Sequence, residues 1–154
     1  MPQPTPPDYR LITRWTLPAE PDRVWAVLAD PDLTWPRWWP GLIADWSTPD
    51  RAGFTLRPSR WAYALRFTLA IEHRDAPSHA TLRVAGDLVG TGLVHIAPTA
   101  EGSTLELDWQ VRTTRAWMIR TAPLLAPMFR LAHTHAMNRG ERGLREFLRA
   151  HPAA

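Results

Sequence analysis

Residues 34–40 read Thr-Trp-Pro-Arg-Trp-Trp-Pro and hold three of the nine tryptophans of this 154-residue chain. The tryptophans recur at helical spacing, so the stretch predicts a short helix that Thr34 caps and that ends at Pro40. Towards the other end of the chain, residues 116–149 carry a much longer helical pattern. Only strand patterns and turns lie between the two helical stretches. This order of elements is typical of an antiparallel sheet that curves around one long helix and encloses a cavity.

The residues before this stretch predict a strand and a first helix. Residues 9–17 mix aromatic and β-branched side chains with polar ones and stop before a proline, as a strand would. Pro21 then opens a helix, because a missing N–H is harmless in the first turn, and the apolar residues of 24–28 form its buried stripe. We expect the Pro-rich residues 1–7 to be a disordered tail. Residues 8–150 are expected to form a single domain, since a chain of this length buries a substantial core.

Six strand patterns follow the second helix. They lie at 42–46 and 53–56, which form a predicted hairpin, and at 61–72, 80–84, 88–96 and 104–113. The clearest is 61–72, where large apolar residues alternate with small or polar ones, so one face of that strand must be buried. In the last strand Glu106 and Asp108 alternate with apolar residues and are expected to face water. Gly90 and Gly92 indicate curvature or a bulge in the sheet.

The long C-terminal helix should be bent and should turn small residues towards the sheet. Pro123 and Pro127 predict a kink before its main segment. At about 100° per residue, one stripe collects Leu125, Phe129, Ala132, Ala136, Gly140, Gly143 and Phe147. Small residues in the middle of the stripe either let the helix approach the sheet closely or leave open space. We therefore predict an α+β fold, in which a curved antiparallel sheet of about six to seven strands wraps around this helix.

The composition excludes several classes of protein. All 18 basic residues are arginine, against 15 acidic residues, which gives a formal net charge of +3. The arginines are scattered rather than gathered beside stacking aromatics, so nucleic acid is not expected as a partner. With no cysteine there is no disulfide framework, thiolate nucleophile or thiolate metal site. No apolar run approaches the ~18 residues of a membrane span, and none has signal-peptide length, so we expect a soluble, cytoplasmic protein.

Short strings spread over nearly the whole chain carry a family resemblance. They are Val24-Trp25 with Leu28-Ala29-Asp30, residues 35–41, Gly90-Thr91-Gly92, Gly102-Ser103-Thr104, Trp109-Gln110-Val111-Arg112, and His133 through Met137 to Leu144. In these strings the chain resembles the SRPBCC superfamily of START and birch-pollen-allergen proteins, and within it the polyketide cyclase/dehydrase-like group. The resemblance implies a helix-grip fold and a cavity for a hydrophobic small molecule. Members include carriers, ligand sensors and cyclases, so the resemblance does not select a reaction.

His133 is the candidate catalytic residue. On the helical projection it lies about 50° from the centre of the buried stripe, whereas His135 lies more than ~100° away. An imidazole facing a closed apolar pocket can act as general acid or base in an aldol cyclisation and dehydration. The alternative is a structural histidine hydrogen-bonded to the backbone or to an acid. The resembling proteins also carry His here with Met four residues later, as at Met137, but often have Asn where this chain has Ala132.

Large flat side chains are predicted to line the cavity and to stack on an aromatic or polyketide-like ligand. The set comprises Trp39, near the cavity mouth, then Trp61, Tyr63, Phe67 and Trp109 on the inward parity of their strands, and Phe129 and Ala136 on the helix. The alternative is that these side chains only fill a core.

No metal and no cofactor are expected. Glu72, His73, Asp75 and His79 cluster around one predicted turn. Hairpin tips are usually solvated, and this spacing matches no closed zinc pattern. No glycine-rich loop lies between a strand and a helix, so nothing indicates a nucleotide.

Three hypotheses for function follow. The first is an enzyme of the polyketide cyclase/dehydrase type, in which His133 transfers the proton. The second is a non-catalytic carrier or sensor of apolar ligands, favoured because only His133 and Tyr63 are inward and titratable. The third is an interaction module that uses residues 35–39, which requires those rings to be exposed as a patch. A homodimer is compatible with each of them.

Overall fold

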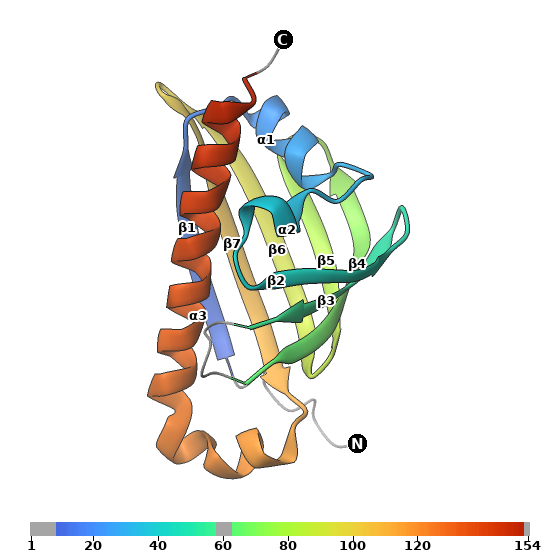
Figure 1. Ribbon diagram of the computed structural model, residues 1–154, viewed down its shortest axis with the longest axis vertical. Coiled ribbons are helices and arrows are strands. Elements are labelled where there is room, and N and C mark those ends of the chain that lie inside the picture. The colour runs from blue at the N-terminus through green and yellow to red at the C-terminus, as the bar shows by residue number, and fades with distance from the viewer. Residues whose placement is uncertain (1–8, 58–62, 153–154) are drawn as a thin grey trace.

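The computed structural model describes residues 9–57 and 63–152, and it shows one antiparallel sheet that curves around a long helix (Figure 1). The seven strands are β1 (Tyr9–Leu17), β2 (Leu42–Ser47), β3 (Arg51–Leu56), β4 (Leu65–Asp75), β5 (His79–Gly86), β6 (Leu88–Thr99) and β7 (Gly102–Thr113). The helices are α1 (Pro21–Leu28), α2 (Trp35–Trp38) and α3 (Ala116–Ala150). The predicted helix-grip fold is confirmed.

The strand order is β1-β7-β6-β5-β4-β3-β2, so β1 and β2 form the two edges of an unclosed sheet. Strands β2 to β7 pair as consecutive hairpins, whereas β1 pairs with β7 at the far edge. Helices α1 and α2 carry the chain from one edge to the other across one end of the sheet (Figure 1). The predicted hairpin between β2 and β3 is confirmed. Strand β4 begins at Leu65, later than the sequence pattern suggested, and Trp61 lies outside the described residues.

The irregularities of the sheet lie away from the glycines that suggested a bulge. Register shifts fall between Ala44 and Trp46 in β2 and next to Ile71 in β4. Gly90 and Gly92 pair without interruption with both neighbouring strands. No bulge therefore occurs at these glycines, whose role is instead to make room for neighbouring groups.

The alternation of side chains along β7 confirms the predicted register. Leu105 and Leu107 are buried on the inner face. On the outer face the Glu106 carboxylate lies 2.7 Å from the Arg14 guanidinium, and Asp108 lies 3.1 Å from Arg10 of β1. Because the arginines of both pairs are largely exposed to water, these ion pairs favour the strand pairing only modestly.

A cluster of tryptophans fills the core at the α2 end of the molecule. The rings of Trp38 and Trp39 stack with centroids 5.7 Å apart, and Trp15 of β1 packs edge-on against Trp39 at 5.4 Å. The indole N–H of Trp39 donates a hydrogen bond to the Ala136 carbonyl of α3 at 3.0 Å. Trp38 and Trp39 are buried and Trp35 is partly buried against the core, so the rings of residues 35–39 do not form the exposed patch that the third hypothesis requires.

Two glycines of α3 allow this cluster to touch the helix. A Cβ atom at Gly143 would overlap the backbone carbonyl of Trp38, and one at Gly140 would lie 2.6 Å from the Trp39 ring and 2.9 Å from the Trp15 ring. Real Cβ atoms do not approach other atoms so closely. At this end of α3, the small residues of the helical stripe therefore allow the tryptophan cluster to pack directly on the helix. Close packing was one of the two predicted alternatives.

The start of α2 differs from the prediction in one detail. Thr34 occupies the N-cap position but lies in the helical region of backbone space, and its side chain makes no capping hydrogen bond. Its carbonyl instead accepts the first backbone bond of the turn, from the N–H of Arg37 at 2.8 Å. The packing of the tryptophans holds this four-residue helix in place.

Polar contacts fix α3 against the edge strand β1. The backbone N–H of Thr16 donates to the Glu141 carboxylate at 2.9 Å, and the Arg145 guanidinium donates to the Thr16 carbonyl at 2.7 Å. Glu141 and Arg145 also pair with each other at 3.3 Å. The helix thereby satisfies both backbone groups of an edge residue that has no strand on that side.

The first turns of α3 bend away from the main segment, as the two prolines predicted (Figure 1). Pro123 and Pro127 lie inside the helix and are exposed. Each removes one backbone N–H donor, which permits the bend. None of the helices in the described part of the chain combines the length and the apolar composition that a membrane span requires.

The Gly143→Ala substitution tests the close contact. Alanine favours an isolated helix by about 1 kcal/mol over glycine. Here we expect the opposite sign, a loss of about 1–3 kcal/mol of unfolding free energy, because the new methyl group displaces α2. Denaturant unfolding measures the change. Asn138→Ala, on the exposed face of the same helix, is the control and should change stability little; equal effects of both substitutions would contradict the close packing.

Candidate functional site

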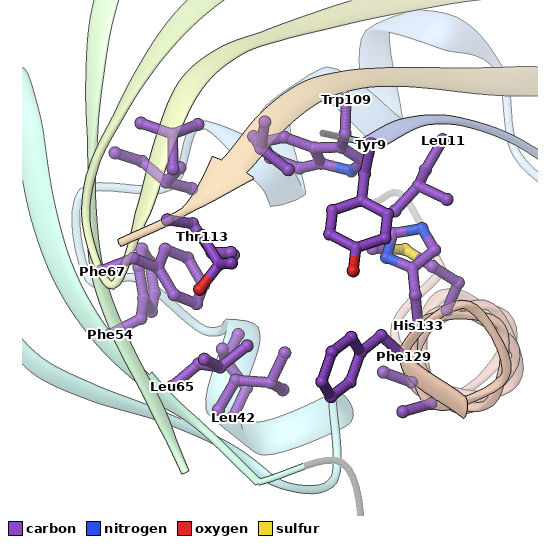
Figure 2. A pocket seen from close by; sticks show the side chains of 18 of the residues that line it. Tyr9, Leu11, Leu42, Phe54, Leu65, Phe67, Trp109, Thr113, Phe129 and His133 are labelled. Atoms are coloured by element: carbon purple, nitrogen blue, oxygen red, sulfur yellow. The ribbon is translucent and has the colours of Figure 1, made fainter. Parts of the chain in front are cut away.

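A cavity of about 130 Å³ lies between the inner face of the sheet and α3 (Figure 2). Its walls are almost entirely apolar. They are formed by Tyr9, Leu11, Trp35, Trp39, Leu42, Phe54, Leu56, Tyr63, Leu65, Phe67, Leu69, Val84, Leu88, Trp109, Val111, Thr113, Met118, Phe129, Ala132, His133, Ala136 and Met137. Every strand and the helices α2 and α3 contribute, which explains why only the complete fold assembles the site.

The period of two in the strands decides which side chains reach the cavity. In β4 Leu65, Phe67 and Leu69 line the wall, while Arg66 between them is exposed on the other face. In β1 the same parity places Tyr9 and Leu11 on the wall. Sequence reasoning did not single out Tyr9, although its parity with Trp15 was visible in the strand pattern.

Gly92 gives Trp109 its place in the wall. These residues are partners on neighbouring strands, and a Cβ atom at Gly92 would lie 2.6 Å from the Trp109 ring. The indole therefore lies across the β6 backbone. Its Nε1 atom is buried and has no hydrogen-bond partner within the described residues. A donor on the cavity wall is thus left for a ligand or for water.

The predicted site residues in the described chain all line this one cavity. They are Trp39, Tyr63, Phe67, Trp109, Phe129, Ala136 and His133. Trp61 lies outside the described residues. The Trp39 ring is buried against Trp15 and Gly140 and is tied to α3, and its expected place near the cavity mouth stays a prediction. That these residues contact a ligand stays a prediction.

Phe129 is the centre of an aromatic cluster at the opposite end from Trp39. Its ring meets Tyr63, Trp117 and Tyr9 edge-on, with centroids 5.7, 6.1 and 6.4 Å apart. Trp117 and Tyr63 also contact each other at 5.4 Å. Edge-to-face packing is a favourable geometry for aromatic pairs, so the cluster forms a firm wall between the bent part of α3 and the sheet.

Tyr63 supplies a hydroxyl close to this wall. Burial raises its pKa above the ordinary value of 10.0, with a smaller contribution from the neighbouring Tyr9. The phenol is therefore protonated at neutral pH, when it can donate a hydrogen bond. Figure 2 shows the Tyr9 hydroxyl directed towards the open space, whereas the Thr113 hydroxyl donates a hydrogen bond to the Met118 sulfur at 3.3 Å.

His133 is the titratable group of the cavity with the largest change in acidity. Burial lowers its pKa from the ordinary 6.5 to about 4, because the apolar surroundings disfavour the charged imidazolium. Its Nε2 atom is buried and has no partner in the described part of the chain. Among the described residues, none of those that line the cavity carries a carboxylate. His135 is exposed on another face of the helix, as predicted.

The acidic and histidine residues around the β4–β5 turn do not form a metal site. The described residues contain no group of three or more His, Cys, Asp or Glu side chains arranged to hold a metal ion. Glu72 pairs with Arg83. His79 stacks on His95 with ring centroids 4.4 Å apart, on the exposed face of the sheet. This cluster lies away from the cavity.

Comparison with solved structures finds the same fold in several bacterial proteins. A Thermus thermophilus protein superposes with a TM-score of 0.75 at 16% identity, covering 94% of this chain and all of its own. A Geobacillus kaustophilus protein gives 0.66 at 14% identity, covering 89% of this chain and 94% of its own. A Rhodobacter sphaeroides protein gives 0.62 at 18% identity, covering 92% of each chain. At these identities the likeness concerns the fold.

A search of curated proteins finds no match. The family model described as polyketide cyclase / dehydrase and lipid transport matches residues 12–150, from the first strand to the last turn of α3. With the helix-grip fold and an apolar cavity under the helix, the chain belongs to the polyketide cyclase / dehydrase and lipid transport family.

Proposed function

We propose that this protein binds an apolar, aromatic or polyketide-like small molecule in the cavity between the sheet and α3. The observation that carries the proposal is the composition of the walls, in which aromatic and aliphatic side chains surround a space that the protein leaves open. Protein interiors normally close such spaces. Apolar pockets with a few polar groups are the usual form of a small-molecule site.

The size of the cavity limits the ligand. An apolar cavity of about 150 Å³ accepts a benzene-sized molecule. The cavity of about 130 Å³ therefore suits a ligand of one ring, and a ligand of two rings only when wall side chains move. Phe67, Trp109 and Phe129 offer flat faces to such rings, while the groups on Trp109, Tyr63 and His133 offer hydrogen bonds that fix the ligand's orientation.

The acidity of His133 favours binding without catalysis. A general base works best when its pKa lies near the operating pH. An imidazole with a pKa of about 4 is neutral at pH 7 and accepts protons weakly. The described residues of the cavity wall include no carboxylate that would strengthen it as a base. Binding as a carrier or sensor is therefore the function that the geometry supports best.

Cavity filling tests the binding proposal. Ala136→Phe places a ring in the cavity, so we expect the affinity for naphthalene, a two-ring hydrocarbon, to fall at least about tenfold. Titration calorimetry measures the affinity, and native mass spectrometry of the untreated protein identifies any bound apolar molecule.

Ala150→Phe, on the exposed last turn of α3, is the matched control and should bind naphthalene normally. Thermal unfolding shows whether Ala136→Phe is folded, and Ala132→Leu is a milder replacement on the same wall. A wild-type protein that carries no molecule and binds neither benzene nor naphthalene would contradict the proposal.

The buried imidazole also predicts a pH dependence of stability. The pKa of His133 is about 4 when folded and near 6.5 when unfolded, so the unfolded chain binds the additional proton between these values. This contribution is complete above pH 6.5 and is lost as the pH falls towards 4. Between these two pH values the unfolding free energy changes by at most about 1.4 kcal/mol per pH unit because of this one group. His133→Gln should remove that part of the slope in urea unfolding, whereas His135→Gln should keep it; identical slopes for all three proteins would disprove the buried neutral state.

A second candidate function is proton transfer by His133, favoured by its unpartnered Nε2 atom on the cavity wall. In this case the protein should accelerate the exchange of hydrogen for deuterium next to the carbonyl of 1-tetralone in D₂O, followed by NMR. His133→Gln should lose the acceleration while 1-tetralone binding is largely kept. If the protein binds 1-tetralone but the exchange rate equals that in buffer, His133 does not transfer the proton, and the carrier function is the one that remains.

A further inference from the structure

The first half of α3 exposes an unusual amount of apolar surface. Leu124 is 82% exposed and Leu131 is 70% exposed, and Ile119, Met128 and Trp117 have between 40% and 52% of their surface in water. Single exposed apolar residues are common, but five within fifteen residues of one helix form a patch. We call these five residues the α3 apolar patch.

Three residues of the α3 apolar patch lie on the side of the helix opposite to Phe129. Leu124, Met128 and Leu131 follow the i, i+4, i+7 spacing of one helical face, and Arg120 precedes them on the same face. Phe129, on the opposite side of the same turns, is buried. Figure 1 shows this bent part of α3 at the end of the molecule away from α1 and α2. The segment therefore has two apolar faces, of which one packs against the fold.

The charged residues within this segment of the sequence have one sign. Between Asp108 and Glu141 the sequence has no acidic residue, whereas it has five arginines, at positions 112, 115, 120, 130 and 139. Arg115 pairs with Asp87 of the β5–β6 turn, and the Arg130 guanidinium lies 5.5 Å from the Tyr9 ring. Arg120 is exposed beside the apolar residues. The patch thus combines apolar side chains with basic ones.

We infer that the α3 apolar patch docks the protein on the surface of an anionic lipid bilayer. Helices that lie in a bilayer interface have apolar side chains, often with Trp, flanked by Arg or Lys. The apolar side chains enter the boundary between headgroups and acyl chains, and the arginines are attracted to anionic headgroups. This inference is independent of the ligand that the cavity holds.

A second copy of this chain fits the patch less well. A two-fold interface would place the patch against itself and would bring the arginines of one helix close to those of the other. Residues 116–140 contain no acidic residue, so the two helix segments would supply no opposite charge across such an interface. An anionic surface provides that compensation.

The patch is also continuous with the cavity wall. Trp117, which belongs to the patch, contacts Tyr63 and Phe129 at 5.4 and 6.1 Å, and the next residue, Met118, lines the cavity. A bilayer that covers the patch therefore lies directly next to one wall of the cavity. When the protein is docked there, the bilayer and the cavity, which are the two apolar environments open to a ligand, lie side by side.

Vesicle sedimentation tests the inference with the full chain. Wild-type protein should sediment with vesicles of phosphatidylglycerol and phosphatidylcholine, less with phosphatidylcholine alone, and less at high salt. The double substitution Leu124→Gln/Leu131→Gln should weaken this binding by about tenfold or more, since it removes the two most exposed apolar side chains. Arg120→Gln should reduce binding to the anionic vesicles and leave the weak binding to phosphatidylcholine unchanged.

Ile12→Gln/Leu93→Gln is the matched control, because these residues are 58% and 42% exposed on the outer face of the sheet. It should bind vesicles like the wild type, and thermal unfolding should show that both double variants are folded. Failure of the wild type to bind anionic vesicles, or equal binding by the two double variants, would overturn the inference. So would a wild-type dimer in analytical ultracentrifugation that Leu124→Gln/Leu131→Gln dissociates, since the patch would then belong to a second copy.

Discussion

The contact between α3 and the tryptophans of α2 sets the distance between helix and sheet. At Gly140 and Gly143 the helix has no side chain, so the rings of Trp15 and Trp39 and the backbone of Trp38 lie directly on it. The hydrogen bond from Trp39 to the Ala136 carbonyl fixes the rotation of the helix at the same place. Towards the other end of α3 the small residues Ala132 and Ala136 line the cavity, and Phe129 packs against Tyr9 and Tyr63. The cavity therefore lies beside the part of α3 that follows Phe129 and precedes the close contact at the glycines.

Much of this arrangement could be predicted from the sequence because it depends on periodicity. The alternation in 61–72 and 104–113 identified the buried faces, and the helical projection separated His133 from His135. The stripe of small residues indicated either a close contact or a space. The structure contains both, close contact at Gly140 and Gly143 and open space at Ala132 and Ala136, because one stripe passes two different parts of the sheet.

The features that could not be predicted depend on contacts between distant residues. Gly92 resembles a bulge glycine when β6 is considered alone, but its neighbour is the ring of Trp109 on β7. Trp39 follows a short helix and was expected near the cavity mouth. It is buried because β1 brings Trp15 against it. Thr34 has the side chain of an N-cap, yet packing of the adjacent tryptophans rather than a capping bond holds α2. In each case a tertiary contact outweighs a local preference.

Keeping the cavity open requires stability from elsewhere in the molecule. At about 24 cal/mol per Å³, a void of about 130 Å³ costs about 3 kcal/mol relative to a filled core, which is a large part of the 5–15 kcal/mol that typically stabilises a domain. A flexible aliphatic core would relax into such a space. Here rigid rings form much of the wall beside the aliphatic side chains, and several rings are fixed by their own contacts: Trp39 by α3, Trp35 by stacking on Phe54 at 5.4 Å, and Phe129 by Tyr9, Tyr63 and Trp117. Their indole and phenyl planes cannot fold inwards without breaking those contacts. The high tryptophan content thus has a mechanical role, since it maintains an apolar space that hydrophobic packing alone would close.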